Sequence, residues 1–149
     1  MIDIVRYREE LAELRERVNE VSELQIDGVV VAVHEGHMQK KLKDKEGIYL
    51  CGNYPDAEMT GADDNHQDNN RVLLFLLEKI GAGSQTDEEE LQHYARMQRL
   101  MKCVKDELLD SRLVCGGLDA QADIRTEWEY GIFGGFNGLS IGLTVKDYD

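Results

Sequence analysis

Cysteine is scarce in this chain of 149 residues, and long apolar runs are missing. Cys51, Cys103 and Cys115 are odd in number and widely spaced, and no two of them form a C-x-x-C pair. This pattern predicts free thiols in a reducing, cytoplasmic setting. No apolar run approaches the roughly 20 residues that span a bilayer, so no membrane partner is expected. The first residues, MIDIVRYREEL, are charged where a secretory signal is apolar, so export by that route is not expected.

Positive charge is also in short supply. The chain has 17 Lys and Arg residues against 30 Asp and Glu residues, which gives a formal net charge of -13. The one basic run, residues 40–45, is interrupted by Asp44. Binding of nucleic acid phosphates needs a larger face of Lys and Arg, so no nucleic acid partner is expected. The acidity favours a solvated surface, a basic protein partner or a bound cation.

The composition nevertheless predicts a folded protein. Apolar residues make up 42% of the chain and charged residues 32%, which favours a globular domain over disorder. The length fits a single domain over residues 1–149, long enough to bury a core.

Periodicity predicts a helix and two strands in the first part of the chain. Apolar residues recur at helical spacing over Ile2–Ser22, and this seam must be covered by the sheet of its own domain or by another subunit. The seam consists of Ile4, Tyr7, Leu11, Leu14, Val18 and Val21. A β-branched run at Val29–Val33 predicts a strand that is buried on both faces or is an inner strand of a sheet, and Gly47–Tyr54 predicts a second strand. The polar residues 34–46 between them are expected to form the loop of a hairpin.

The middle of the chain is expected to hold a long loop and two helices. The polar segment Pro55–Asn70 exceeds the usual length of a connection, which indicates a functional, mobile or partner-covered loop. The segment Arg71–Ile80 is apolar most of the way round and predicts a buried helix. Thr86 and Glu89 form a capping box before a second amphipathic helix, which runs to about Leu109. These helices form an αα-hairpin, or one helix broken by glycines.

The last residues, Gln121–Asp149, predict a second β-hairpin. Two runs of alternating apolar residues flank Asn137-Gly138, a pair that tolerates the positive φ angles of a type I′ turn. Leu139, Ile141, Leu143 and Val145 fall on one face of the last strand. The predicted fold is therefore α+β: an antiparallel sheet of about four strands with helices mainly on one face, in the order α-β-β-α-α-β-β.

Two groups of residues are candidates for binding a divalent metal. The segment 63–70 offers oxygen ligands suited to Ca²⁺ or Mg²⁺, although it lacks the Gly and Glu of an EF-hand loop. Its candidate ligands are Asp63, Asp64, His66 and Asp68, with Asn65, Asn69 and Asn70 beside them. The alternative is a solvated loop whose last Asn or Asp caps the next helix. His34 and His37 could join His66 in a metal site, but their spacing is one residue short of H-E-x-x-H.

The second candidate site is a partner contact at the glycine-rich tip of the last hairpin. It consists of Phe133, Gly134, Gly135, Phe136 and Asn137. No phosphate-binding glycine motif occurs there, and glycines in hairpins also mark bulges or close approach of another backbone. A docking loop and a purely structural role both fit. No nucleophile motif is present, and carboxylates are too numerous to assign an acid and a base.

The element order, together with the C-terminal sequence EYGIFGGFNGLSIGLTVKDYD, resembles small phage neck and tail-completion proteins of the tail-terminator type. That resemblance implies an α+β domain that assembles into a ring, with terminal strands and loops making the subunit contacts. It implies no catalytic residues and no cofactor. The expected protein is a non-enzymatic structural or assembly component that forms homo-oligomers, in the cytoplasm or in a virion. The alternatives are an acidic module that binds a basic partner, and a metal-dependent enzyme built on His34, His37, His66 and the acidic loop.

Overall fold

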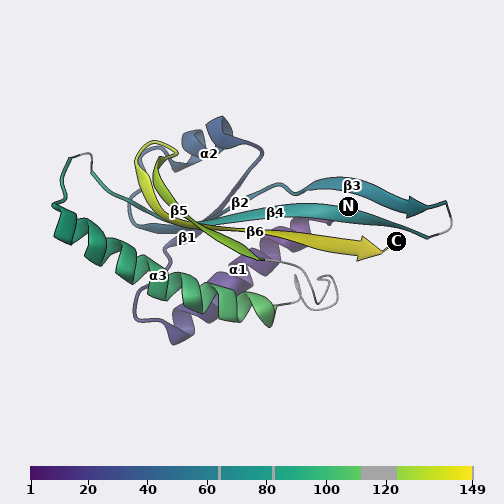
Figure 1. The fold of residues 1–149 in the computed structure, drawn as a ribbon, viewed down its shortest axis with the longest axis horizontal. Helices are drawn as coiled ribbons and strands as arrows, with labels where there is room; N and C mark the ends of the chain where they lie inside the picture. The colour runs from purple at the N-terminus through teal and green to yellow at the C-terminus, as the bar shows by residue number, and fades with distance from the viewer. Residues whose placement is uncertain (64, 82, 112–123, 149) are drawn as a thin grey trace.

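A computed structural model describes residues 1–63, 65–81, 83–111 and 124–148. Nine elements follow one another along these residues (Figure 1). In order they are α1 (Ile4–Val21), β1 (Gly28–Ala32), α2 (Glu35–Leu42), β2 (Ile48–Asn53), β3 (Asp56–Ala62), β4 (Asn65–Lys79), α3 (Asp87–Leu109), β5 (Arg125–Ile132) and β6 (Phe136–Tyr148). Cys115, Gly116 and Gly117 lie outside the described residues.

The 15-residue strand β4 is the centre of a six-stranded mixed sheet. On one side it pairs with β6, which in turn pairs with β5. On its other side two strands follow each other end to end: β2 pairs with residues 74–78 of β4, and β3 pairs with residues 65–71. Strand β1 extends the sheet beyond β2 and is parallel to it, whereas the remaining pairs are antiparallel.

Helices cover the two faces of the sheet unequally. Helices α1 and α3 cover one face, called the helix face below, and their apolar side chains join those of the sheet in the larger core. The short helix α2 lies on the opposite face, the α2 face, over a smaller core that includes Met38, Leu42 and Phe136. No helix in the described ranges has both the length and the apolar character needed to cross a bilayer.

Several predictions are confirmed. The fold is α+β, and most of the helical mass lies on one face of the sheet. The first helix was placed at Ile2–Ser22 and lies at Ile4–Val21, capped by the Asp3 carboxylate. The middle of its seam is buried in the core of its own domain. Thr86 caps α3 as expected, since its hydroxyl accepts a hydrogen bond from the Glu89 N–H at 3.2 Å.

The number and order of the elements differ from the prediction: the described ranges contain six strands rather than about four, and the first two strands are parallel. Residues 34–46 were expected to be a hairpin loop, but they contain α2. Two parallel strands cannot be joined by a tight turn, so the chain crosses over through a helix. His34 caps this helix by accepting a hydrogen bond from the His37 N–H at 3.2 Å.

The predicted helix at Arg71–Ile80 is wrong, because this segment is the second half of β4. Val72, Leu74 and Leu76 pack on the helix face, while Leu77 packs on the α2 face. A strand that is covered on both faces has no alternation of apolar and polar residues, so its sequence resembles that of a buried helix. The predicted loop Pro55–Asn70 is likewise wrong, since it forms β3 and the start of β4.

The last hairpin is confirmed, but its turn is not at Asn137-Gly138. Both residues lie inside β6, opposite Glu78 and Leu77 of β4. The turn is made by residues 133–135, where Phe133, Gly134 and Gly135 have φ angles of 51°, 87° and 110°. Leu139, Ile141, Leu143 and Val145 are buried on the helix face as predicted.

Candidate interaction site

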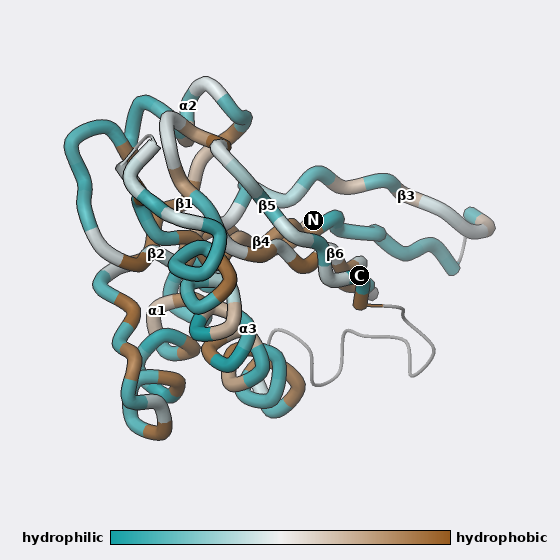
Figure 2. The backbone as a smooth tube through the Cα atoms, turned by 60° about the vertical axis from the view of Figure 1, so that its left-hand side comes forward, coloured by the Kyte–Doolittle hydropathy of each residue, from teal (hydrophilic) through white to brown (hydrophobic). Residues whose placement is uncertain are grey.

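One end of the sheet extends beyond the helices as an arm, defined here as β3 and the residues 65–71 of β4 that pair with it (Figures 1 and 2). Ala57 of β3 is half-buried, and the other residues of that strand are exposed. Met59 is 62% exposed. Asp56 and Glu58 place two carboxylates on the same strand. The outermost strand of the arm is therefore acidic and covered on neither face.

The N-terminus supports the base of the arm. The backbone N–H of Ile2 donates to Asn70 Oδ1 at 3.1 Å, and Asn70 Nδ2 donates to the Val145 carbonyl at 3.1 Å. The terminal ammonium group of Met1 forms an ion pair with the Asp68 carboxylate. These contacts hold β4 and β6 at the base of the arm, whereas β3 is bound only through β4.

The outer edges of β1 and β3 differ in whether side chains occupy them. Three side chains occupy the outer edge of β1. Arg8 donates to the Val29 carbonyl at 3.3 Å, Lys41 donates to the Val31 carbonyl at 2.5 Å, and the Val33 N–H donates to His37 Nδ1 at 3.0 Å. Within the described part of the chain, the hydrogen bonds of β3 side chains are made with Asn69 and Arg71 of β4, and nothing covers its outer edge. Such open edges are sites where another strand can be added.

The predicted metal ligands of the arm do not converge. Asp63 is exposed in the turn between β3 and β4, and Asp64 lies outside the described residues. His66 and Asp68 are both on β4, but Asp68 is already paired with the terminal ammonium group. Among the residues that the structure describes, no three His, Cys, Asp or Glu side chains form a metal-binding group.

The other two histidines of the predicted metal site, His34 and His37, lie at the start of α2, over the opposite end of the sheet from the arm that carries His66 (Figure 1). Desolvation, together with the positive charges of Lys41, His34 and Lys40, lowers the pKa of His37. A neutral ring suits its position, because Nδ1 of His37 must accept the hydrogen bond from Val33. His37 thus serves the edge of β1 in this structure.

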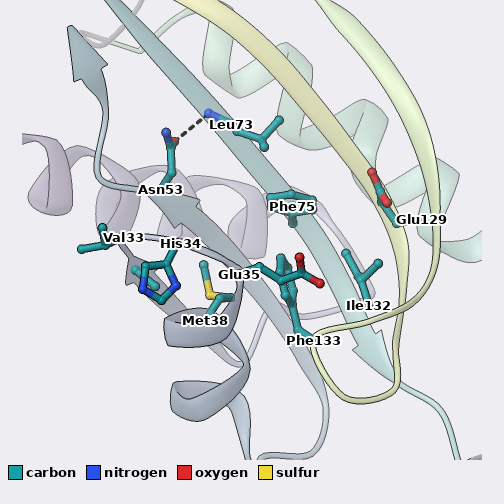
Figure 3. Close-up of a pocket in the computed structure, with 11 residues that line it drawn as sticks. Val33, His34, Glu35, Met38, Asn53, Leu73, Phe75, Glu129, Ile132 and Phe133 are labelled. Carbon is teal, nitrogen blue, oxygen red and sulfur yellow. Dashed lines mark hydrogen bonds between the residues drawn. The ribbon is translucent and has the colours of Figure 1, made fainter.

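A pocket of about 450 Å³ lies on the α2 face, between α2, β4 and the turn of the last hairpin (Figure 3). Its apolar lining consists of Leu73 and Phe75 of β4, Ile132 at the end of β5 and Phe133 of the turn. The rings of Phe75 and Phe133 meet edge to face with their centroids 5.1 Å apart. Leu73 is 40% exposed, so the pocket is open to solvent.

Two polar side chains of this pocket, those of Asn53 and Glu129, are engaged within the protein. Asn53 Nδ2 donates to the Arg71 carbonyl at 3.0 Å, and Asn53 Oδ1 accepts from the Leu73 N–H at 2.8 Å. Glu129 accepts a hydrogen bond from the Ser140 hydroxyl at 2.8 Å. The pocket therefore suits an apolar group more than a polar substrate.

The five residues predicted as a partner contact divide between surface and interior. Phe133, Gly134 and Gly135 form the turn beside the pocket, and Gly134 lies next to Gln39 of α2. Phe136 is 1% exposed and belongs to the smaller core, and Asn137 is also buried. The Asn137 side chain accepts a hydrogen bond from the Gly131 N–H at 2.6 Å, which shapes the irregularity between β5 and β6. Only the first three are placed to meet a partner.

Sequence reasoning missed the residues that define the edges of the sheet. Arg8, His37 and Lys41 come from α1 and α2 and meet only because both helices border β1. No spacing in the sequence signals that convergence. Leu73 and Phe75 were hidden by the incorrect assignment of their strand as a helix.

Neither a protein-family model nor a curated protein matches this chain.

Proposed function

We propose that this chain is a non-enzymatic structural or assembly protein that works by associating with further copies of itself. The observation that carries the proposal is the arm, whose strand β3 is exposed on both faces and open along its outer edge. The resemblance to phage neck and tail-completion proteins supplies the finer form of the proposal. In that form the chain is a component of a phage tail or neck, located in the cytoplasm or in the virion.

The composition of the arm supports this reading. Its strands contain Asp, Asn and Gly residues, which are unfavourable in β-strands. Strand β3 is paired along one edge only, with β4, whose other edge pairs with β6 from residue 67 onward. Pairing with another copy would supply the hydrogen bonds and contacts that the arm lacks. The protected edge of β1 shows that an open edge is not the general condition of this sheet.

Light scattering on the full chain, over a wide range of protein concentrations, tests the proposal. We expect a mass above the 17.0 kDa of one chain. Neighbouring residues of a strand direct their N–H groups to opposite edges, so Met59→Pro and Thr60→Pro are compared separately. The variant that removes an outward N–H should lower the mass, with circular dichroism as the control for folding. A single 17.0 kDa species of the unmodified chain at every concentration would contradict self-association.

A further inference from the structure

The outer edge of the sheet has the shape of a step. Strands β2 and β3 lie end to end along β4, and β1 is added only outside β2. The outermost strand is therefore β1 in one half of this edge and β3 in the other half. Strand β3 lies one strand closer to β4 than β1 does. The recess beside β3 has the width of one strand, which is about 4.8 Å.

We propose that β3 of one copy pairs with β1 of a second copy, and β1 of the first copy with β3 of the second. The result is a symmetric dimer with one continuous sheet. This inference rests on the proposed function and names the surface and the partner through which it works. Two copies related by a twofold axis perpendicular to the sheet place each β1 in the recess of the other, so the step is complementary to itself.

Strand direction fits this arrangement. Strands β1 and β2 are parallel, and both β2 and β3 are antiparallel to β4, so β1, β2 and β3 run the same way. The twofold axis reverses the second copy, and its β1 then runs antiparallel to β3. The five residues of β1 fit within the seven of β3.

Charge favours the pairing of β3 with β1 over a pairing of two β3 strands or of two β1 strands. Two β3 strands would bring Asp56 and Glu58 of both copies onto one seam. Two β1 strands would bring together the cations Arg8 and Lys41, which lie on that edge. Strand β1 has no charged side chain, so no register with β3 places like charges directly opposite each other.

The side chains on each face of β3 also suit the residues that they would meet in the dimer. Asp56 and Glu58 are opposite Arg71 and Asn69, which share the α2 face of β4 with Leu77. In the dimer these carboxylates face the exposed lysines of α2 and its following turn, which lie on the same side of the sheet. Those lysines are Lys40, Lys41 and Lys43.

The apolar residue of the arm lies on the other side of β3. Met59 is opposite Asp68, on the helix face. It would meet Val29, a half-buried residue that packs against the larger core. Strand β5 offers no equivalent site, because Glu127 and Glu129 would share a face with Asp56 and Glu58.

The contacts that now occupy the β1 edge are exchanged when the dimer forms. Arg8 leaves the Val29 carbonyl and Lys41 leaves the Val31 carbonyl, and both carbonyls accept hydrogen bonds from β3 instead. The freed ammonium group of Lys41 then pairs with the incoming carboxylates, which lie on the same face of the sheet. An open edge in one copy and a basic, capped edge in the other thus form a specific contact.

Charge reversal on each edge tests the pairing by sedimentation equilibrium. The arm variant carries Asp56→Lys and Glu58→Lys. The border variant carries Lys40→Glu and Lys43→Glu, which are exposed and make no hydrogen bond in the described part of the chain. Each variant should weaken the dimer at least about thirtyfold, because four exposed ion pairs per dimer become repulsive. The control Arg96→Glu with Lys102→Glu, on the exposed surface of α3, makes the same change in charge as the border variant and should leave the dimer intact.

Mixing the two variants gives the sharpest result. The reversed arm of one variant is complementary to the reversed border of the other, and the two unmodified surfaces also match. The mixture should therefore recover a species of twice 17.0 kDa, and so should a chain that carries all four substitutions. If the border variant dimerises as the unmodified chain does, the β3–β1 pairing is overturned while self-association stands. If the unmodified chain never dimerises, the proposed function itself fails.

Discussion

Two glycines of β6 show how differently a single residue can constrain the fold. A Cβ atom added to Gly138 would lie 2.0 Å from the carbonyl oxygen of Leu76, in the backbone of the neighbouring strand. A Cβ atom added to Gly142 would lie 3.8 Å from the Leu73 side chain, which is an ordinary contact. The glycine at position 138 therefore permits the close approach of β4 and β6 at the centre of the sheet.

We predict that Gly138→Ala lowers the free energy of unfolding by about 3 kcal/mol or more, because two paired backbones cannot separate locally to make room. Gly142→Ala is the matched control on the same strand. It should be neutral or stabilise the fold by up to about 1 kcal/mol, since alanine restricts the unfolded chain more than glycine does. Urea unfolding measures both. Equal effects of the two substitutions would show that the contact at Gly138 is unimportant.

His37 is the second informative residue, because its hydrogen bond requires a neutral ring. Its pKa is lowered in the folded chain, so the unfolded chain binds the proton more tightly. Its contribution to stability is therefore complete above the ordinary histidine pKa of about 6.5 and decreases as the pH falls below that value. Protonation also removes the acceptor for the Val33 N–H at the border of β1.

An NMR titration of the four histidine rings checks this expectation, with His37→Gln used to assign the signal. The His37 ring should titrate below pH 6.5, and the amide signal of Val33 should shift over the same pH range. A His37 ring that titrates at or above that value would contradict the hydrogen bond to Val33.

At the scale of elements, the sequence predicted correctly those helices and strands that have one face packed against the protein and one face in solvent. Helices α1 and α3 have one buried side and one wet side, so their apolar spacing could be recognised directly. The same holds for β6, whose residues alternate between core and surface near its end. Local periodicity carries the necessary information wherever only one face is covered.

Strands β3 and β4 could not be predicted for opposite reasons. The second half of β4 is covered by helices on one face and by the smaller core on the other, so it shows no alternation. Strand β3 is covered on neither face, and its few apolar residues, such as Met59, do not mark a buried face. Strand β4 is fixed by its pairing with β6, whose residues lie far away in the sequence, and β3 is a strand because it pairs with β4. The candidate site was missed with them, because it is an edge of the sheet.

At the scale of the whole molecule, the proposed dimer links stability to protein concentration. A partner that binds only the folded state stabilises that state by mass action. The free energy of unfolding of a dimer of two 149-residue chains should therefore increase as the protein concentration rises. A tenfold increase adds about 1.4 kcal/mol per dimer, which corresponds to a rise of about 2 °C in the melting temperature.

Calorimetry of the unmodified chain and of the arm variant Asp56→Lys with Glu58→Lys measures this effect. The melting temperature of the unmodified chain should rise with concentration, while that of the variant should stay constant, because a monomer unfolds without a change in particle number. The control Arg96→Glu with Lys102→Glu should behave like the unmodified chain. A melting temperature of the unmodified chain that stays constant over the whole concentration range would mean that the exposed arm is stable without a second copy.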